Sequence, residues 1–371
     1  LTILSGDIGV VGDDSDNSYH VVNFSNGDTN AILDGVTVTG GKTPTSWPDY
    51  HGAGFYGDGG GATLRNIVVT GNSAYYHGGG IYNDGGALVI DNAVFENNEI
   101  TGINGDGGCI HHSSGSVQVT NSELRGCNGR LGGGFYSDDG TVTLVDVLIE
   151  GNVSANAGGG MYISSSNNTS LTRVAFVGNS GSYGGGLSNS DVSGGPLMLT
   201  DVQFIRNIAT SQGGGMNNQG AAEMVNLVFY GNSAERGGGL RNYGIGGAHT
   251  TFVSNALFVG NTATNEGGGC YSEVPDEGGV FTLLNGTFVA NHSDGGGGGF
   301  NNRRGAAPAA LIANSVFRGN TASYGSQISY TYDDVTVSYT DVEGGYAGTG
   351  NIDADPLFWR MPDPGIDTVW G

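Results

Sequence analysis

The sequence predicts an all-β chain that forms a single right-handed parallel β-helix of about 11–13 coils, with three short strands in each coil. Three observations predict this fold. A glycine triplet followed by an apolar residue recurs about every 27 residues, asparagine recurs in step with it, and apolar stretches of strand length lie between the two columns. No helical period runs through the intervening segments. Three short strands cannot fold alone, so we expect each strand to pair with its equivalents in the neighbouring coils.

The glycine column divides the chain into coils. We expect residues 1–50 to form opening coils, residues 51–330 to form repeats of about 27 residues per coil, and residues 331–371 to form a C-terminal coil and a truncated end region. The residue after each triplet should point inward, because alternate residues of a strand face opposite sides. The triplets or their variants begin at Gly52, Gly78, Gly107, Gly132, Gly158, Gly184, Gly213, Gly237, Gly267, Gly297 and Gly325.

The asparagine column lies three residues after a large apolar residue, usually phenylalanine. An asparagine side chain carries both donors and an acceptor, so identical residues stacked coil on coil can bond to one another. We therefore expect a structural amide ladder at one corner of the helix. Its members are Asn72, Asn98, Asn152, Asn179, Asn207, Asn232, Asn261, Asn291 and Asn320.

Two of the three cysteines interrupt these columns. Cys109 replaces the last glycine of a triplet, and Cys127 replaces a ladder asparagine 18 residues later. Substitution at two structural positions suggests a compensating pair, and two alternatives stay open: a disulfide, or two small buried thiols. Cys270 follows a triplet and is expected in the core.

The composition limits the classes of function. Lys and Arg number 12 against 35 Asp and Glu, so the net charge is −23. A nucleic-acid partner is excluded because a basic footprint is missing. A membrane-spanning segment is not expected, because glycine or a polar residue interrupts every apolar run. The acidic surface suits Ca²⁺ as a structural ion, and no other cofactor is expected.

The paired GGG-apolar and F-x-x-N repeats of about residues 50–330 resemble those of the chlamydial polymorphic outer-membrane proteins. The ends are similar to another group, the bacterial cell-surface right-handed β-helix proteins that often carry a choice-of-anchor region. That likeness rests on residues 4–8 (LSGDI) and 18–22 (SYHVV) at the start, and on residues 341–345 (DVEGG) and 351–358 (NIDADPLF) near the end. The resemblance implies a parallel β-helix at the cell surface or in the extracellular space, with the signal and any anchor outside this chain.

Three sets of side chains are candidate metal ligands, one for Zn²⁺ or a similar ion and two acidic ones for Ca²⁺, and polar surface is the alternative for each. His51, His77 and Asp106 precede three consecutive triplets, so stacking would place them about 5 Å apart, as Zn²⁺ or a similar ion requires. An acidic cluster of Ca²⁺-like composition consists of Asp13, Asp14 and Asp16. A further acidic region near the C-terminus consists of Asp353, Asp355, Asp363 and Asp367.

An aromatic strip is the candidate binding surface. The residue two positions after each triplet should face outward, and in five adjacent coils it is aromatic or histidine. Such a strip could bind sugar rings or a partner chain, or it could only stabilise the sheet by stacking. The members are Tyr56, Tyr82, His111, Tyr136 and Tyr162.

The basic residues are scattered along the sequence, and paired carboxylates such as Asp138 and Asp139 fall in turns, so no catalytic constellation is found. We expect a non-enzymatic structural protein of the cell surface, a rigid rod that assembles with itself into a filament, sheath or adhesive stalk. A first alternative is an adhesin that binds a surface polysaccharide or a partner through the tyrosine strip. A second alternative is a polysaccharide-active enzyme.

Overall fold

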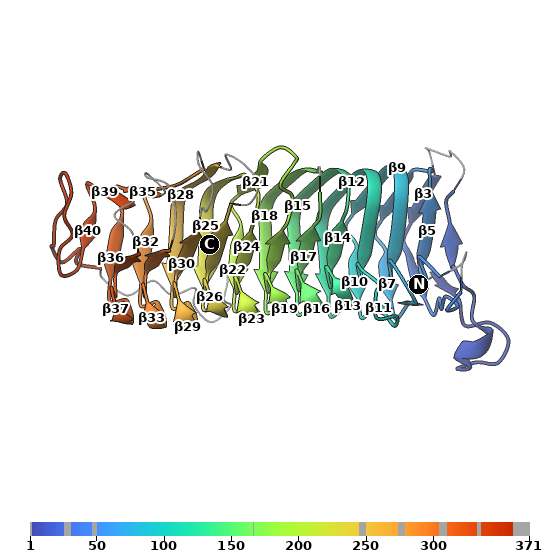
Figure 1. The fold of residues 1–371 in the computed structure, drawn as a ribbon. Helices are drawn as coiled ribbons and strands as arrows, with labels where there is room; N and C mark the ends of the chain where they lie inside the picture. The colour runs from blue at the N-terminus through green and yellow to red at the C-terminus, as the bar shows by residue number, and fades with distance from the viewer. Residues whose placement is uncertain are drawn as a thin grey trace. The chain divides into compact units, whose positions relative to one another are not determined.

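The computed structural model describes residues 2–25, 31–46, 50–165, 167–244, 250–273, 279–303, 310–331 and 335–358. These residues form an all-β parallel solenoid of about 10 turns (Figure 1). They contain no α-helix, and a single 3-10 turn, η1, covers Asp14–Asp16. The fold class predicted from the sequence is confirmed. The higher expected number of coils included the incomplete repeats at both ends.

The chain divides into two compact units, each built from the same repeat. Unit one comprises residues 1–175 and 179–181, and unit two comprises residues 176–178 and 182–371. Of the expected end region, residues 359–371 lie outside the described residues, as do Asp363 and Asp367.

Unit one contains the strands from β1 to β19, of which β18 and β19 also contribute residues to unit two. They are β1 (Thr2–Ser5), β2 (Val22–Asn23), β3 (Ala31–Asp34), β4 (Val36–Thr39), β5 (Phe55–Asp58), β6 (Ala62–Arg65), β7 (Val68–Thr70), β8 (Ser73–Ala74), β9 (Ile81–Asp91), β10 (Val94–Glu96), β11 (Glu99–Ile100), β12 (Ile110–Arg125), β13 (Asn128–Leu131), β14 (Phe135–Ser137), β15 (Gly140–Glu150), β16 (Val153–Ala157), β17 (Met161–Ile163), β18 (Asn167–Val177) and β19 (Ser180–Tyr183).

Unit two contains the remaining strands. They are β20 (Leu187–Asn189), β21 (Leu197–Thr200), β22 (Gln203–Ile205), β23 (Ile208–Gln212), β24 (Met216–Asn218), β25 (Ala222–Tyr230), β26 (Ser233–Arg236), β27 (Leu240–Tyr243), β28 (Thr250–Val259), β29 (Thr262–Glu266), β30 (Cys270–Glu273), β31 (Val280–Leu284), β32 (Thr287–Val289), β33 (His292–Gly296), β34 (Phe300–Asn302), β35 (Ala310–Ala313), β36 (Val316–Arg318), β37 (Thr321–Tyr324), β38 (Ile328–Tyr330), β39 (Val335–Ser338) and β40 (Asp341–Val342).

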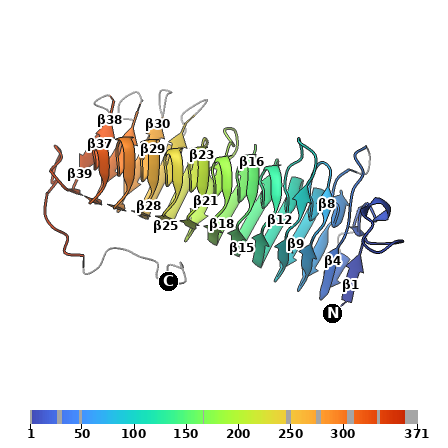
Figure 2. The same cartoon turned by 90° about the horizontal axis from the view of Figure 1, so that it is seen from below.

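Within each unit, strands from successive turns pair in parallel. The strands that follow the triplets pair in the order β5–β9–β12–β14–β17 in unit one and β20–β24–β27–β30–β34–β38 in unit two. A further strand segment precedes each triplet and forms a sheet of its own (Figure 2). It consists of β8, β11, β13 and β16 in unit one, of β19, which has residues in both units, and of β23, β26, β29, β33 and β37 in unit two. Equivalent residues of the repeat therefore lie one above another.

Two columns of inward side chains fill the core. The residue after the triplet is fully buried in most turns, as Phe55, Ile81 and Leu240 illustrate. In unit two the phenylalanines that precede the asparagine column stack face to face, with ring centroids 4.3–5.0 Å apart. Stacked rings bury a large apolar area in an offset arrangement that aromatic pairs favour. The core predicted from the periodicity is the one observed.

The triplets are glycine because the chain bends there against another backbone. Gly237, the first of its triplet, has φ +63°, a conformation that glycine adopts without strain. A Cβ on Gly239, the third, would lie 2.5 Å from the carbonyl oxygen of Gly269 in the next turn and 3.3 Å from the Asn261 side chain. The third glycine therefore makes room for both the next turn and a ladder asparagine.

Candidate functional site

The predicted amide ladder is present and buried in both units. In unit two, Asn232 Nδ2 donates to Asn261 Oδ1 at 2.9 Å and to the Phe204 carbonyl at 2.8 Å, while Asn232 Oδ1 accepts from the backbone and side-chain nitrogens of Asn207. The same pattern continues through Asn291 to Asn320. In unit one it joins Asn72 to Asn98 and Asn152 to Asn179. Each buried amide is thus satisfied by its neighbours, as a low-dielectric interior requires.

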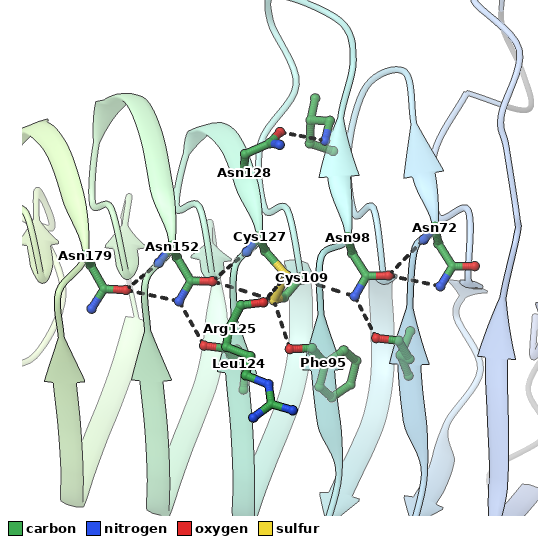
Figure 3. The surroundings of a disulfide bond; sticks show 12 residues. Asn72, Phe95, Asn98, Cys109, Leu124, Arg125, Cys127, Asn128, Asn152 and Asn179 are labelled. Atoms are coloured by element: carbon green, nitrogen blue, oxygen red, sulfur yellow. Dashed lines mark hydrogen bonds between the residues drawn. A yellow bond between two sulfur atoms is a disulfide. The ribbon is translucent and has the colours of Figure 1, made fainter.

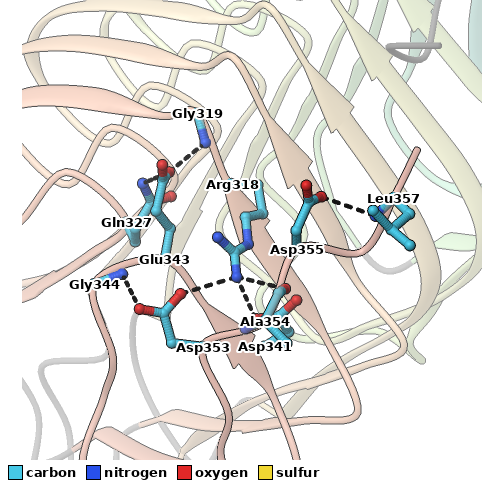
Figure 4. Close-up of polar contacts among 10 residues, drawn as sticks. All are labelled: Arg318, Gly319, Gln327, Asp341, Glu343, Gly344, Asp353, Ala354, Asp355 and Leu357. Atoms are coloured by element: carbon cyan, nitrogen blue, oxygen red, sulfur yellow. Dashed lines mark hydrogen bonds and ion pairs between the residues drawn. The ribbon is translucent and has the colours of Figure 1, made fainter. Parts of the chain in front are cut away.

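In unit two the amide ladder continues beyond Asn320 to Gln327 and ends at the carboxylate of Glu343; Figure 4 shows the last two of these residues. Asn320 Nδ2 donates to Gln327 Oε1 at 2.7 Å, and Gln327 Nε2 donates to Glu343 Oε2 at 2.9 Å. Gln327 occupies the third position of the degenerate last triplet, so a side chain that faces the ladder replaces the usual glycine there. Nearby, Arg318 Nη2 donates to Asp341 Oδ1 and Asp353 Oδ1, each at 2.9 Å. The predicted Ca²⁺ ligand Asp353 is therefore already paired with an arginine.

Cys109 and Cys127 form a disulfide, the first of the two alternatives that the sequence left open (Figure 3). Cys127 lies in the line of the ladder, where its backbone N–H donates to Asn152 Oδ1 at 2.9 Å. Asn98 Nδ2 donates to the Val69 carbonyl at 2.8 Å, but along the ladder it meets the Cys127 sulfur, at 3.9 Å, in place of an amide oxygen. The covalent bond therefore spans the one turn in which the amide ladder lacks an asparagine. Cys270 is free and buried in the core, as expected.

A second, exposed ladder lies on the surface and was missed from the sequence. Its residues sit six positions before the ladder asparagines and adopt positive φ, which asparagine and aspartate tolerate better than other side chains. Asn226, for example, donates to Asp201 Oδ1 at 2.9 Å and accepts from Asn255 Nδ2 at 3.1 Å. The signal was a third periodic column. It consists of Asn66, Asn92, Asn121, Asp146, Arg173, Asp201, Asn226, Asn255, Asn285 and Asn314.

The predicted tyrosine strip forms a continuous stack in unit one. Tyr56 stacks on Tyr82 at 5.6 Å, Tyr82 on His111 at 5.2 Å, His111 on Tyr136 at 4.6 Å and Tyr136 on Tyr162 at 5.6 Å, with interplanar angles of 8–20°. The expected exposure is wrong for two members, since His111 is 5% and Tyr136 is 8% exposed, and the others are half-buried. The inner rings have neighbours on both faces. This aromatic stack therefore presents ring edges rather than ring faces to a ligand.

Histidines extend the aromatic stack. His20 stacks on Tyr56 at 4.9 Å, His51 on Tyr82 at 4.5 Å, and His77 on His111 at 4.2 Å. Burial lowers the pKa of His51 to about 4 and that of His77 to about 3, and it holds the pKa of His111 well below its usual value. The imidazoles of His51, His77 and His111 are therefore neutral at physiological pH.

The predicted metal site at His51, His77 and Asp106 is wrong. The two imidazoles stack at 5.0 Å with 12° between their planes, so their nitrogens do not converge on one point. The Asp106 carboxylate accepts two bonds from Arg130, at 3.1 and 2.9 Å, and one from the Leu131 backbone. Burial raises the pKa of Asp106, and the bonds from Arg130 oppose that shift. His77 Nδ1 accepts from the backbone N–H of Asp106, which agrees with a neutral imidazole although the carboxylate is 3.9 Å away.

The three aspartates near the N-terminus also diverge. Asp13 accepts from Ser15 within η1, Asp14 pairs with Lys42 at 2.6 Å, and Asp16 accepts from the backbone of Val10. Among the described residues, no group of three or more His, Cys, Asp or Glu side chains is arranged to hold a metal ion. The clustering of aspartates in the sequence comes from separate turn and pairing roles.

The fold and these side chains together define a class, a parallel β-solenoid built from stacked side-chain ladders. No model of a known protein family matches the sequence, and no curated protein matches it either. Among solved structures, the crystal structure of tailspike protein 3 of bacteriophage CBA120 matches with a TM-score of 0.44 and 12% identity, over 95% of this chain and 59% of that chain. The chain thus spans about three fifths of the length of that protein. None of the described residues form a helix that is long and apolar enough to cross a membrane.

Proposed function

We propose that this chain is a non-enzymatic structural protein of the extracellular space or cell surface, a stiff β-solenoid scaffold that assembles with itself. The observation that supports this proposal best is that the side chains of the repeated polar columns contact one another from turn to turn. The buried asparagines hydrogen-bond to one another, and so do the side chains of the exposed column. In the aromatic stack the ring faces pack against one another. A chain selected for stiffness would repeat such self-complementary positions turn after turn.

The disulfide supports the location. Disulfides persist in oxidising compartments and are rare in the reducing cytosol. The bond between Cys109 and Cys127 therefore agrees with the cell-surface location that the repeat resemblance implies. Self-assembly fits the architecture, because the outermost parallel strands of a solenoid offer unpaired backbone donors and acceptors to another copy.

The alternative of an adhesin that stacks sugars on the tyrosine strip is less well supported. Sugar stacking needs an open aromatic face, whereas His111 is covered by Tyr82 on one side and Tyr136 on the other. The hydroxyls of Tyr82 and Tyr136 already bond to Ser113 and Ser164, and burial raises the pKa of both tyrosines and keeps them neutral.

Negative-stain electron microscopy of the purified full chain, with and without a Ca²⁺ chelator, tests the proposal. We expect filaments or sheets whose repeat is set by the length of one or two copies. Dispersed single particles at all concentrations would contradict self-assembly. Release of reducing or unsaturated sugars from a polysaccharide panel would instead establish an enzyme.

A further inference from the structure

Three arginines that are dispersed in the sequence come together in unit two. Arg236 ends β26, Arg241 lies in β27, and Arg303 follows β34. In a chain with only 12 basic residues and a net charge of −23, three neighbouring arginines are unusual, and the carboxylates of Glu235, Glu266 and Glu273 lie beside them. Arg236 and Arg241 lie on one turn and Arg303 lies two turns further on, so Arg303 reaches the others across the turn that carries Glu266 and Tyr271.

Two of the arginines share one carboxylate oxygen. Arg236 Nε lies 3.5 Å and Arg303 Nη1 lies 3.3 Å from Glu266 Oε2. The Glu266 side chain is only 14% exposed, while the Arg303 side chain is 46% exposed. Contacts of this length are weaker than a bidentate arginine–carboxylate pair, whose N–O distances are about 2.7–2.9 Å. Arg303 also bonds to the Tyr271 hydroxyl, and Arg236 Nη2 lies 3.8 Å from Glu235, but a guanidinium has five N–H donors, so both retain donors for another anion.

The third arginine is buried without an acidic partner in hydrogen-bond contact. Arg241 is 5% exposed, Arg241 Nη1 donates to Asn217 Oδ1 at 2.8 Å, and its guanidinium lies 4.2 Å from the Tyr243 ring centroid. Its Nε has no hydrogen-bond partner. Burial lowers the pKa of Arg241 to about 10, so the group stays charged at neutral pH. The charge of Glu273 opposes this shift but makes no hydrogen bond to Arg241, and keeping such a charge buried costs stability, which is expected where the charge serves a ligand.

Besides these carboxylates, neutral hydrogen-bonding groups lie beside the cluster. Tyr271, opposite Arg241 in the register of β27 and β30, donates its hydroxyl to Glu273 Oε2 at 3.0 Å. Asn301 lies opposite Tyr271 on the next strand and is 3% exposed, and its Oδ1 has no hydrogen-bond partner. Amides, a phenol and an aromatic ring beside arginines match a ligand that carries both hydroxyl and carboxylate groups.

We propose that the arginine cluster of unit two binds the carboxylate of an acidic saccharide. The carboxylate bonds to Arg303 and Arg236 in competition with Glu266, and the sugar hydroxyls bond to the neighbouring amides. A chain of sugar rings can follow the turns, because one ring is about as long as the spacing between turns. This inference goes beyond the scaffold role and does not depend on it.

Isothermal titration calorimetry of the full chain with oligogalacturonate tests the site, with a neutral oligosaccharide of equal length and free acetate as comparison ligands. We expect the oligogalacturonate to bind at least tenfold more tightly than either. Arg303→Gln should weaken binding at least tenfold, whereas Glu266→Gln should strengthen it severalfold, because the competing carboxylate is lost. Arg206→Gln is the matched control, since Arg206 is an exposed arginine of unit two beside Tyr230.

The opposite signs of the two variants separate binding from folding, because a folding defect would weaken binding in both. Thermal unfolding of each variant is the control that checks whether the variant is folded. The proposal is overturned if oligogalacturonate binds neither the native chain nor Glu266→Gln. Equal binding of acetate and oligogalacturonate would equally overturn a saccharide site.

Discussion

The disulfide between Cys109 and Cys127 occupies the place where neighbouring turns have a glycine against an asparagine amide. In those turns a Cβ on the third glycine would lie 3.0–3.3 Å from the ladder side chain, as at Gly80 with Asn98 and at Gly134 with Asn152. A side chain larger than glycine is therefore compatible with this position only if its partner also changes. The two cysteines meet that condition together, and the bond replaces the hydrogen bonds of the missing amide.

The first prediction compares two ways of removing this bond. The disulfide closes a loop of 18 residues, so Cys109→Ser/Cys127→Ser should lower the free energy of unfolding by about 3 kcal/mol. Cys109→Gly/Cys127→Asn also removes the bond but restores the glycine and the amide of the neighbouring turns. We expect it to lose clearly less stability in denaturant titrations. Equal losses would show that restoring the glycine and the asparagine does not stabilise the protein.

The second prediction compares how much the buried ladder and the exposed ladder contribute to the free energy of unfolding. Asn232→Ala removes a fully buried amide, with it the donor to the Phe204 carbonyl and the oxygen that accepts from the Asn207 backbone and side-chain nitrogens, so a loss of about 3–5 kcal/mol is expected. Asn226→Gly removes an exposed ladder side chain while keeping a residue that accepts positive φ, so the loss should stay below about 1 kcal/mol. Chemical unfolding followed by circular dichroism measures both. Similar losses would contradict a privileged role for the buried column.

The third prediction uses two glycines of unit two. A Cβ on Gly239 would meet backbone atoms of the next turn at 2.5 Å, so Gly239→Ala should cost about 2–3 kcal/mol or prevent folding. Gly260 has φ +61° with nothing within 4 Å, so Gly260→Ala should cost only the strain of the left-handed conformation, about 1 kcal/mol. Thermal unfolding ranks the two. A larger loss at Gly260 would mean that backbone conformation, not space, selects glycine in this repeat.

The sequence predicted those features that depend on periodicity alone. Columns such as Asn232 with Asn261 were predicted because identical spacing places identical residues one above another in any parallel solenoid. The outward strip was predicted in position but not in exposure, since the direction and neighbours of the His111 ring depend on its rotamer. The arginine cluster was not predicted, because Arg303 reaches Glu266 only through a long side chain from another column.

The last prediction is a loss of stability in mild acid. His111 and His112 are 5% and 0% exposed, and burial lowers their pKa, to about 4 for His112. Between pH 6.5 and about 4 the unfolded chain therefore binds protons that the folded chain excludes, so the free energy of unfolding falls as the pH falls. The slope is at most about 1.4 kcal/mol per pH unit for each imidazole.

A double variant isolates this effect. His111→Tyr/His112→Asn gives this turn the residues found at Tyr82 and Asn83 in the preceding turn, opposite which the two histidines lie. It should flatten the dependence of the melting temperature on pH between 6.5 and 4. Carboxylates with a lowered pKa, such as Asp91 beside Thr120, add their own loss only below their usual pKa of 3.8, so the two contributions are separate in pH. An unchanged melting temperature of the native chain from pH 7 to pH 5 would contradict neutral buried histidines. An unchanged pH profile in the variant would assign the acid sensitivity to other groups.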